Sequence, residues 1–71
     1  MYKKLRGKII EKYLTTESFA THIKVSRASV SNKLNGKTGF TKQDIILWAS
    51  ALDIPQEDYL SYFFTEELNN M

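Results

Sequence analysis

The chain has 71 residues, of which 42% are hydrophobic, 13% aromatic and 25% charged, and it contains no cysteine. This length suits one domain, residues 1–71, with a small core and no room for a deep small-molecule substrate pocket. The composition is that of a globular protein. Without cysteine there are no disulfides or thiolate metal sites, which fits a reducing cytoplasm. No apolar run approaches the ~20 residues of a membrane span, so no membrane association through a span is expected.

Positive and negative charges are separated along the sequence. All ten basic residues and only two acids lie in residues 1–42, a formal charge of +8, whereas residues 43–71 hold six acids and no Lys or Arg, a formal charge of −6. On an ordinary protein surface, positively and negatively charged residues are interspersed. The split favours nucleic acid as the partner of the basic part, although an acidic protein or membrane surface would also attract it.

The chain begins with an amphipathic pattern that predicts a first helix. Apolar residues recur at helical spacing, and three lysines gather on another face: Leu5, Ile9, Ile10 and Tyr13 against Lys4, Lys8 and Lys12. The lysine face is either a solvated surface or an additional contact to DNA.

Two short helices are predicted next. Thr16 is expected to cap the first of them, with Glu17 in its first turn, and Ser26 to cap the second. The second ends at Asn35-Gly36, because glycine adopts the left-handed conformation at little cost. The two helices share one apolar seam: Phe19, Ala20, Ile23, Val30 and Leu34.

A fourth and a fifth helix complete an all-α fold of five short helices. Thr41 and Asp44 have capping-box spacing and open a helix with one apolar face: Ile45, Trp48, Ala49 and Leu52. Pro55 suits the first turn of the next helix, whose apolar residues are Tyr59, Leu60 and Phe63. From Tyr62 onward two readings stay open: a continuation of this helix, or a short extended C-terminal arm over about residues 62–71.

Residues 16–35 have the organisation of a helix-turn-helix. Ala20 lets the two helix backbones approach closely, and Val25 fills the turn between them. The later helix of the pair then presents a polar outer face: Arg27, Ser29, Ser31, Asn32, Lys33 and Asn35. Such hydrogen-bonding side chains suit the edges of bases and the phosphates of a duplex.

The segment FATHIKVSRASVSNKLNGK, residues 19–37, resembles the motif of the Cro/cI-type (XRE-type) family of phage repressors. The likeness extends over most of the chain. It implies a lambda-repressor-like domain and a transcription regulator of a temperate phage or prophage, acting in the cytoplasm of a bacterial host cell. The family usually has glycine where this chain has Lys24, and a non-glycine residue at positive φ costs on the order of 1 kcal/mol.

The same resemblance assigns roles to individual residues. The third helix would enter the major groove of an operator. Its base-reading positions hold Arg27, suited to guanine, Asn32, suited to adenine, Ala28, suited to a thymine methyl, and Ser31. The positions that contact phosphate hold Thr16, Asn35, Lys37, Thr38 and Lys42.

The expected partner is double-stranded operator DNA, bound by a homodimer so that two half-sites are read together. The C-terminal aromatic residues are the predicted dimer or partner contact: Tyr62, Phe63 and Phe64. The alternative is an antirepressor that binds another phage repressor and blocks its DNA surface, using the acidic second half. We expect no enzyme activity, cofactor or metal, because the lone His22 has no ligand cluster and nothing forms a catalytic triad.

Overall fold

The computed structural model describes residues 2–64 of the chain. Its helices, in chain order, are α1 (Lys3–Tyr13), α2 (Thr16–Ile23), α3 (Arg27–Leu34), α4 (Lys42–Leu52), a 3-10 turn η1 (Gln56–Asp58) and α5 (Tyr59–Phe63). Residues 2–64 contain no strand. The predicted all-α class with five short helices is therefore confirmed.

Two of the predicted helix starts are confirmed by their caps. The side chain of Ser26 accepts a hydrogen bond from the Ser29 N–H at 3.0 Å and so begins α3. At the start of α4, Thr41 Oγ1 accepts from the Asp44 N–H at 3.1 Å, and the Asp44 carboxylate accepts from the Thr41 N–H at 2.9 Å. This is the reciprocal capping box that the spacing predicted.

The predicted cap of α2 is wrong by one residue. Thr15 is the N-cap, with its hydroxyl accepting from the Ser18 N–H at 3.0 Å, and Thr16 is the first helical residue. Two adjacent threonines are equally good caps, so the local pattern does not separate them. The exit from α3 follows the prediction, because Gly36 adopts φ 78°.

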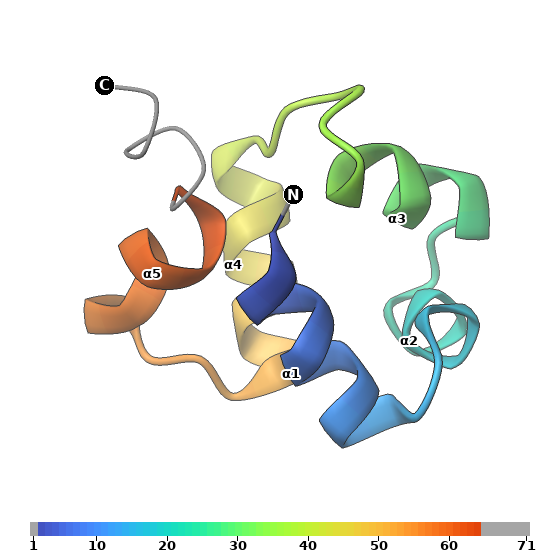
Figure 1. Ribbon diagram of the computed structural model, residues 1–71, viewed down its shortest axis with the longest axis horizontal. Coiled ribbons are helices and arrows are strands. Elements are labelled where there is room, and N and C mark those ends of the chain that lie inside the picture. The colour runs from blue at the N-terminus through green and yellow to red at the C-terminus, as the bar shows by residue number, and fades with distance from the viewer. Residues whose placement is uncertain (1, 65–71) are drawn as a thin grey trace.

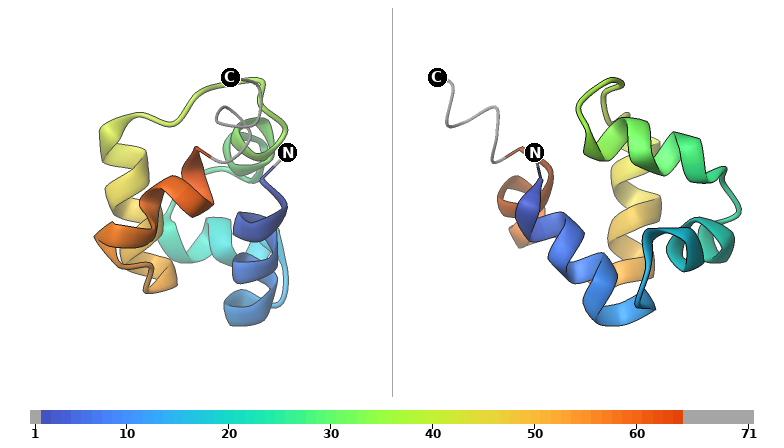
Figure 2. Two further views of the ribbon diagram at one scale, coloured as in Figure 1. Left: turned by 60° about the vertical axis from the view of Figure 1, so that its left-hand side comes forward. Right: turned by 45° about the vertical axis from the view of Figure 1, so that its right-hand side comes forward.

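The helices are arranged around α4 (Figure 1). In Figure 1 and in the right-hand view of Figure 2, α2 and α3 lie on one side of the molecule and α5 lies on the other, with α1 and α4 between them. α1 contacts α2, α4 and α5, whereas α3 packs mainly on α2. The loop of residues 35–41 runs from the end of α3 to the start of α4. This arrangement leaves the outer side of α3 and the adjoining loop at the surface.

The core brings together residues from all five α-helices of the described chain. Its buried members are Leu5, Ile9, Phe19, Ala20, Ile23, Val30, Leu34, Ile45, Trp48, Ala49, Leu52, Ile54 and Phe63. The predicted apolar stripes account for most of them, but Ile10 and Leu60 are exposed. Both lie on the solvent side of short amphipathic helices, where helical spacing alone does not fix the edge of the buried stripe.

Aromatic rings form a chain through this core. Trp48 packs edge-on against Phe19 and Phe40, each with ring centroids 4.9 Å apart, and Phe40 packs against Phe63 at 5.2 Å. Edge-to-face pairs of this kind stabilise beyond the area they bury. The chain of rings links α2, the loop after α3, α4 and α5.

The C-terminal aromatic run begins as a helix. Tyr62 and Phe63 belong to α5, so the extended alternative is wrong for these two residues, because Phe63 is held in the core against Phe40. Phe64 is the C-cap of α5, and the rest of the predicted arm, residues 65–71, lies outside the described part of the chain. Among the described helices, none combines the length and the apolar character that crossing a membrane requires.

Candidate nucleic-acid interface

A tight turn joins α2 to α3. Lys24 adopts φ 61°, and its N–H points back to the carbonyls of Ala20 and Thr21 at the end of α2. The Val25 N–H donates to the Ala20 carbonyl at 3.0 Å. These bonds satisfy the last carbonyls of the helix, as in a C-terminal motif that usually contains glycine. The predicted left-handed residue at this turn is therefore present, with a lysine in the position.

α3 has one buried and one exposed side. Val30 and Leu34 are buried. The predicted base-reading residues lie away from the core: Arg27, Ala28 and Ser31 are exposed and Asn32 is half-buried. Residues four apart share one face of a helix, so Arg27 lies beside Ser31 and Ala28 beside Asn32. The structure thus brings all four residues onto one outward surface.

An acidic residue that was not predicted as part of this surface lies directly against it. The Arg27 guanidinium donates from Nη1 to the Glu17 carboxylate in α2. Both side chains remain largely in solvent, with exposed fractions of 71% for Arg27 and 61% for Glu17. The sequence did contain one usable signal. Both residues lie in the first turn of their helices, and a helix-turn-helix brings those turns together.

The predicted phosphate-binding residues are distributed beside α3. Lys37 and Thr38 lie on the loop that follows it, and Lys42 is the first residue of α4; all three are exposed. The Lys37 N–H donates to the Asn32 carbonyl at 2.9 Å, which holds the start of the loop against α3. Thr16, half-buried, lies apart from this group at the start of α2.

Asn35 is held by neighbours on two helices. Its Oδ1 accepts from the Arg6 guanidinium at 2.6 Å, and its Nδ2 donates to Ser31 Oγ at 3.3 Å. Arg6 also donates to the Leu34 carbonyl at 3.2 Å, which occupies one of the last carbonyls of α3. Asn35 therefore ties α1 to the end of α3. The role of Arg6 in this contact could not be seen from the sequence, because 29 residues separate it from Asn35.

Lys33 fixes the other end of the loop. Its ammonium lies 3.1 Å from the Asp44 carboxylate and 3.4 Å from the Gly39 carbonyl oxygen. Partial burial acts to raise the pKa of Asp44, but the hydrogen bond from the Thr41 N–H and the Lys33 ammonium lower it by a larger amount. The pKa of Asp44 therefore lies below its usual value. Asp44 is therefore a carboxylate at neutral pH.

The lysine face of α1 is engaged with other parts of the same molecule. Lys12 Nζ lies 2.6 Å from the Asp53 carboxylate, a contact that raises the pKa of Lys12 and lowers that of Asp53. Lys8 pairs with Glu11 at 3.5 Å. Lys4 lies over the Tyr62 ring, 4.7 Å from its centroid. By contrast, within residues 2–64, Lys37 and Lys42 take part in none of the ion pairs. In the same described part of the chain, Lys3 and Lys4 at the start of α1 and Lys24 in the turn before α3 are likewise in none of these ion pairs, so the cations outside ion pairs lie at the start of α1 as well as around α3.

The sequence matches a family model described as "Protein of unknown function (DUF739)" over residues 1–66. The chain belongs to the DUF739 family. The match covers every helix of residues 2–64 and the whole interface just described. No curated protein was found to match the chain.

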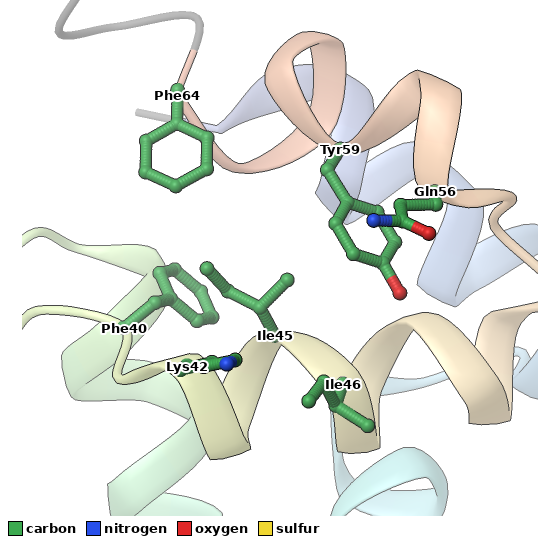
Figure 3. A pocket seen from close by; sticks show the side chains of 7 residues that line it. All are labelled: Phe40, Lys42, Ile45, Ile46, Gln56, Tyr59 and Phe64. Carbon is green, nitrogen blue, oxygen red and sulfur yellow. The ribbon is translucent and has the colours of Figure 1, made fainter.

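In this DUF739 member the C-terminal aromatic residues do not form one contact surface. Phe63 is 1% exposed and belongs to the core. Its predicted role as a partner contact is therefore wrong, because a buried side chain cannot contact a partner. Tyr62 is half-buried beneath Lys4. Phe64 is half-buried and borders a groove between α4 and the η1–α5 segment (Figure 3).

The groove has a volume of about 560 Å³ and is mostly apolar. Its lining residues are Phe40, Lys42, Ile45, Ile46, Gln56, Tyr59 and Phe64. Figure 3 shows Tyr59 and Gln56 above the groove and Ile46 on the α4 side below it. Among the described residues of this DUF739 protein, no group of three His, Cys, Asp or Glu side chains has the arrangement of a metal site.

Proposed function

We propose that this DUF739 protein binds double-stranded DNA in a sequence-specific manner and regulates transcription by occupying an operator. The observation that carries the proposal is the outward surface of α3, formed by Arg27, Ala28, Ser31 and Asn32 on a helix whose other side is buried. An α-helix fits the major groove of B-DNA, which is about 12 Å wide. The guanidinium, amide, hydroxyl and methyl groups of these residues match the chemical groups displayed there.

The surroundings of α3 support the same function. Sequence-independent affinity for DNA comes from cations that neutralise phosphates. Lys37 provides such a cation on the loop after α3, where Thr38 adds a hydroxyl, and Lys42 provides a second one at the start of α4, on the border of the groove. The loop is fixed by Lys33 and Asp44 at one end. Phosphate contacts would therefore set the orientation of α3, while its own side chains discriminate between bases.

The resemblance of residues 19–37 to the Cro/cI-type (XRE-type) phage repressors supports a lambda-repressor-like mode of action in a bacterial host cell. In this mode the protein acts by occupancy, without catalysis or a cofactor. Two copies would read two half-sites. After the correction of Phe63, the surface available for a homodimer contact includes Phe64 and the adjoining groove with its exposed Ile46.

The antirepressor alternative would need free acidic surface in the second half of the chain. Two of the acids there are paired within the molecule, Asp44 with Lys33 and Asp53 with Lys12. Among the described residues this leaves Glu57 and Asp58 as the acids of that half outside an ion pair. We therefore favour DNA over a basic protein surface as the partner.

The test is a titration of the protein into duplexes at several salt concentrations. A random duplex is compared with overlapping duplexes from the DNA around its own gene. The proposal expects that log Kd rises steeply with log salt concentration and that one duplex binds at least 10³-fold more tightly than random DNA. Binding that is weak even at low salt, or equal for all duplexes, would contradict it. A pull-down with a purified phage repressor would then test the alternative.

A further inference from the structure

We propose that Glu17 is a specificity-determining residue, which acts by holding the Arg27 guanidinium in place for a base and away from phosphate. The inference rests on the proposed DNA-binding function and adds a residue to it. Its starting point is the ion pair between the Glu17 carboxylate in α2 and Nη1 of Arg27 in α3.

The pair contributes little to holding the turn together. Both side chains are largely exposed, and exposed ion pairs add little to the free energy of unfolding. The turn is already fixed by the backbone bonds of Lys24 and Val25 and by the buried seam between α2 and α3. The effect of the pair is therefore on the direction of the guanidinium.

The geometry of the guanidinium explains why its direction matters. Arginine has five N–H donors in a planar fork, and it reads guanine by donating two of them to O6 and N7. The bond to Glu17 uses Nη1. This bond does not use the edge formed by Nε and Nη2, and it restricts the orientation of that edge before DNA arrives. A pre-oriented fork loses less conformational freedom on binding.

The charge of the pair also affects discrimination. A free arginine strengthens binding to every duplex, because any phosphate attracts it. With Glu17 beside it, the two charges cancel, and a phosphate that approached Arg27 would also meet a carboxylate of its own sign. Arg27 then adds to the affinity only where a base fits its fork. Glu17 therefore lowers binding to random DNA more than binding to the operator.

The test compares two variants that each remove one carboxylate. Glu17→Gln releases Arg27, whereas Glu11→Gln releases Lys8 on α1 and serves as the matched control, because its ion pair is also on the surface. Dissociation constants are measured for the preferred duplex and for a random duplex at several salt concentrations. Circular dichroism establishes that each variant is folded.

For Glu17→Gln we expect tighter binding to random DNA, a salt slope steeper by about 0.9, and a preference for the operator reduced about tenfold. Glu11→Gln should leave that preference unchanged. In a protein that already carries Arg27→Ala, Glu17→Gln should cause no further loss of preference for the operator, because the arginine that Glu17 positions is absent. Glu17→Gln could instead bind both duplexes more tightly by the same factor, which leaves the preference unchanged. This result would show that Glu17 acts through net charge alone and would overturn the inference.

The same data separate this inference from the function on which it rests. If the unaltered protein discriminates between duplexes and Glu17→Gln discriminates equally well, only the role of Glu17 is refuted. If the unaltered protein binds no duplex in a salt-dependent manner, DNA recognition and the role of Glu17 are both refuted.

Discussion

The Lys33 ammonium lies 3.1 Å from the Asp44 carboxylate and so joins the last turn of α3 to the first turn of α4. The same carboxylate accepts the Thr41 N–H at 2.9 Å and closes the capping box of α4. One side chain thus fixes both the start of a helix and the loop of residues 35–41. That loop bears Lys37 and Thr38, so Asp44 sets the position of proposed phosphate contacts without making one itself.

Replacing Asp44 should destabilise the fold. Asp44→Ala removes half of the capping box and leaves Lys33 without its partner, and we expect the free energy of unfolding to fall by about 1–2 kcal/mol. Urea denaturation followed by circular dichroism measures the change. Glu57→Ala is the control, because Glu57 is an exposed acid in η1. Equal stability of the two variants would contradict the role assigned to Asp44.

The contribution of Asp44 should also depend on pH. Its pKa is lowered in the folded protein by the Thr41 N–H and Lys33, against the effect of partial burial. The folded state therefore binds the proton more weakly than the unfolded state. The stabilisation is complete above the ordinary aspartate pKa of about 4 and is lost as the pH falls through the lowered value. The difference in unfolding free energy between the unaltered protein and Asp44→Ala should accordingly shrink between pH 5 and pH 2. A difference that stays constant would exclude this linkage.

Lys37 should contribute to affinity but not to sequence preference. Lys37→Ala is expected to weaken binding to every duplex alike and to reduce the salt slope by about 1, as the loss of one phosphate contact requires. Lys12→Ala removes an equal charge from α1, where Lys12 is paired with Asp53, and should leave the slope unchanged. Gel-shift titrations over a range of salt concentrations provide the measurement. A change in sequence preference with Lys37→Ala would instead place this residue on a base.

The turn between α2 and α3 can be stabilised by one substitution. Lys24 adopts φ 61°, which glycine reaches without the steric cost of a Cβ atom. Lys24→Gly should raise the free energy of unfolding by up to about 1 kcal/mol, offset in part by the greater freedom of glycine in the unfolded chain. Lys24→Ala removes the same charge but keeps the Cβ, so it should show no such gain. Thermal unfolding distinguishes the two, and equal melting temperatures would argue against strain at this turn.

Two apolar residues of α5 should differ sharply in importance. Phe63 is 1% exposed and packs on Phe40, whereas Leu60 is 60% exposed. We expect Phe63→Ala to reduce the unfolding free energy by about 3–5 kcal/mol, and Leu60→Ala to change it by less than about 0.5 kcal/mol. Chemical denaturation of the two variants tests whether α5 is held against the core by Phe63. A small effect of Phe63→Ala would mean that the helix is not part of the core.

Signals that span a few residues were sufficient to predict the fold. Helix caps and turn residues act on backbone groups within about three residues, so the helix ends that they set can be predicted from the sequence. Examples are Ser26, the pair of Thr41 and Asp44, and Gly36. The errors about which apolar residues are buried have a common cause. Tertiary packing decides which residue at the edge of an apolar stripe is buried, and it places Phe63 inside the core and Leu60 outside.

The candidate interface was predictable only in part. The resemblance to the Cro/cI-type repressors assigned Arg27, Ala28, Ser31 and Asn32 to the outer side of α3, and in the structure these residues are exposed or half-buried. The groups that orient these residues come from elsewhere in the chain. Arg6 reaches Asn35 across 29 residues, and Glu17 reaches Arg27 across 10. No local pattern encodes the pair of Arg6 with Asn35, and the pair of Glu17 with Arg27 follows only once the crossing of α2 and α3 is known.

The position of Trp48 makes it a built-in optical probe. It is the only tryptophan in the chain, it is 1% exposed, and its indole lies against Phe19 of α2 and Phe40 of the loop after α3. Its emission therefore responds to unfolding of the core and, in the native state, to any displacement of the loop through Phe40. A ligand that binds the loop at Lys37 and Thr38 and displaces it would change the intrinsic tryptophan fluorescence, so its binding could be followed without a dye, a label or an added residue.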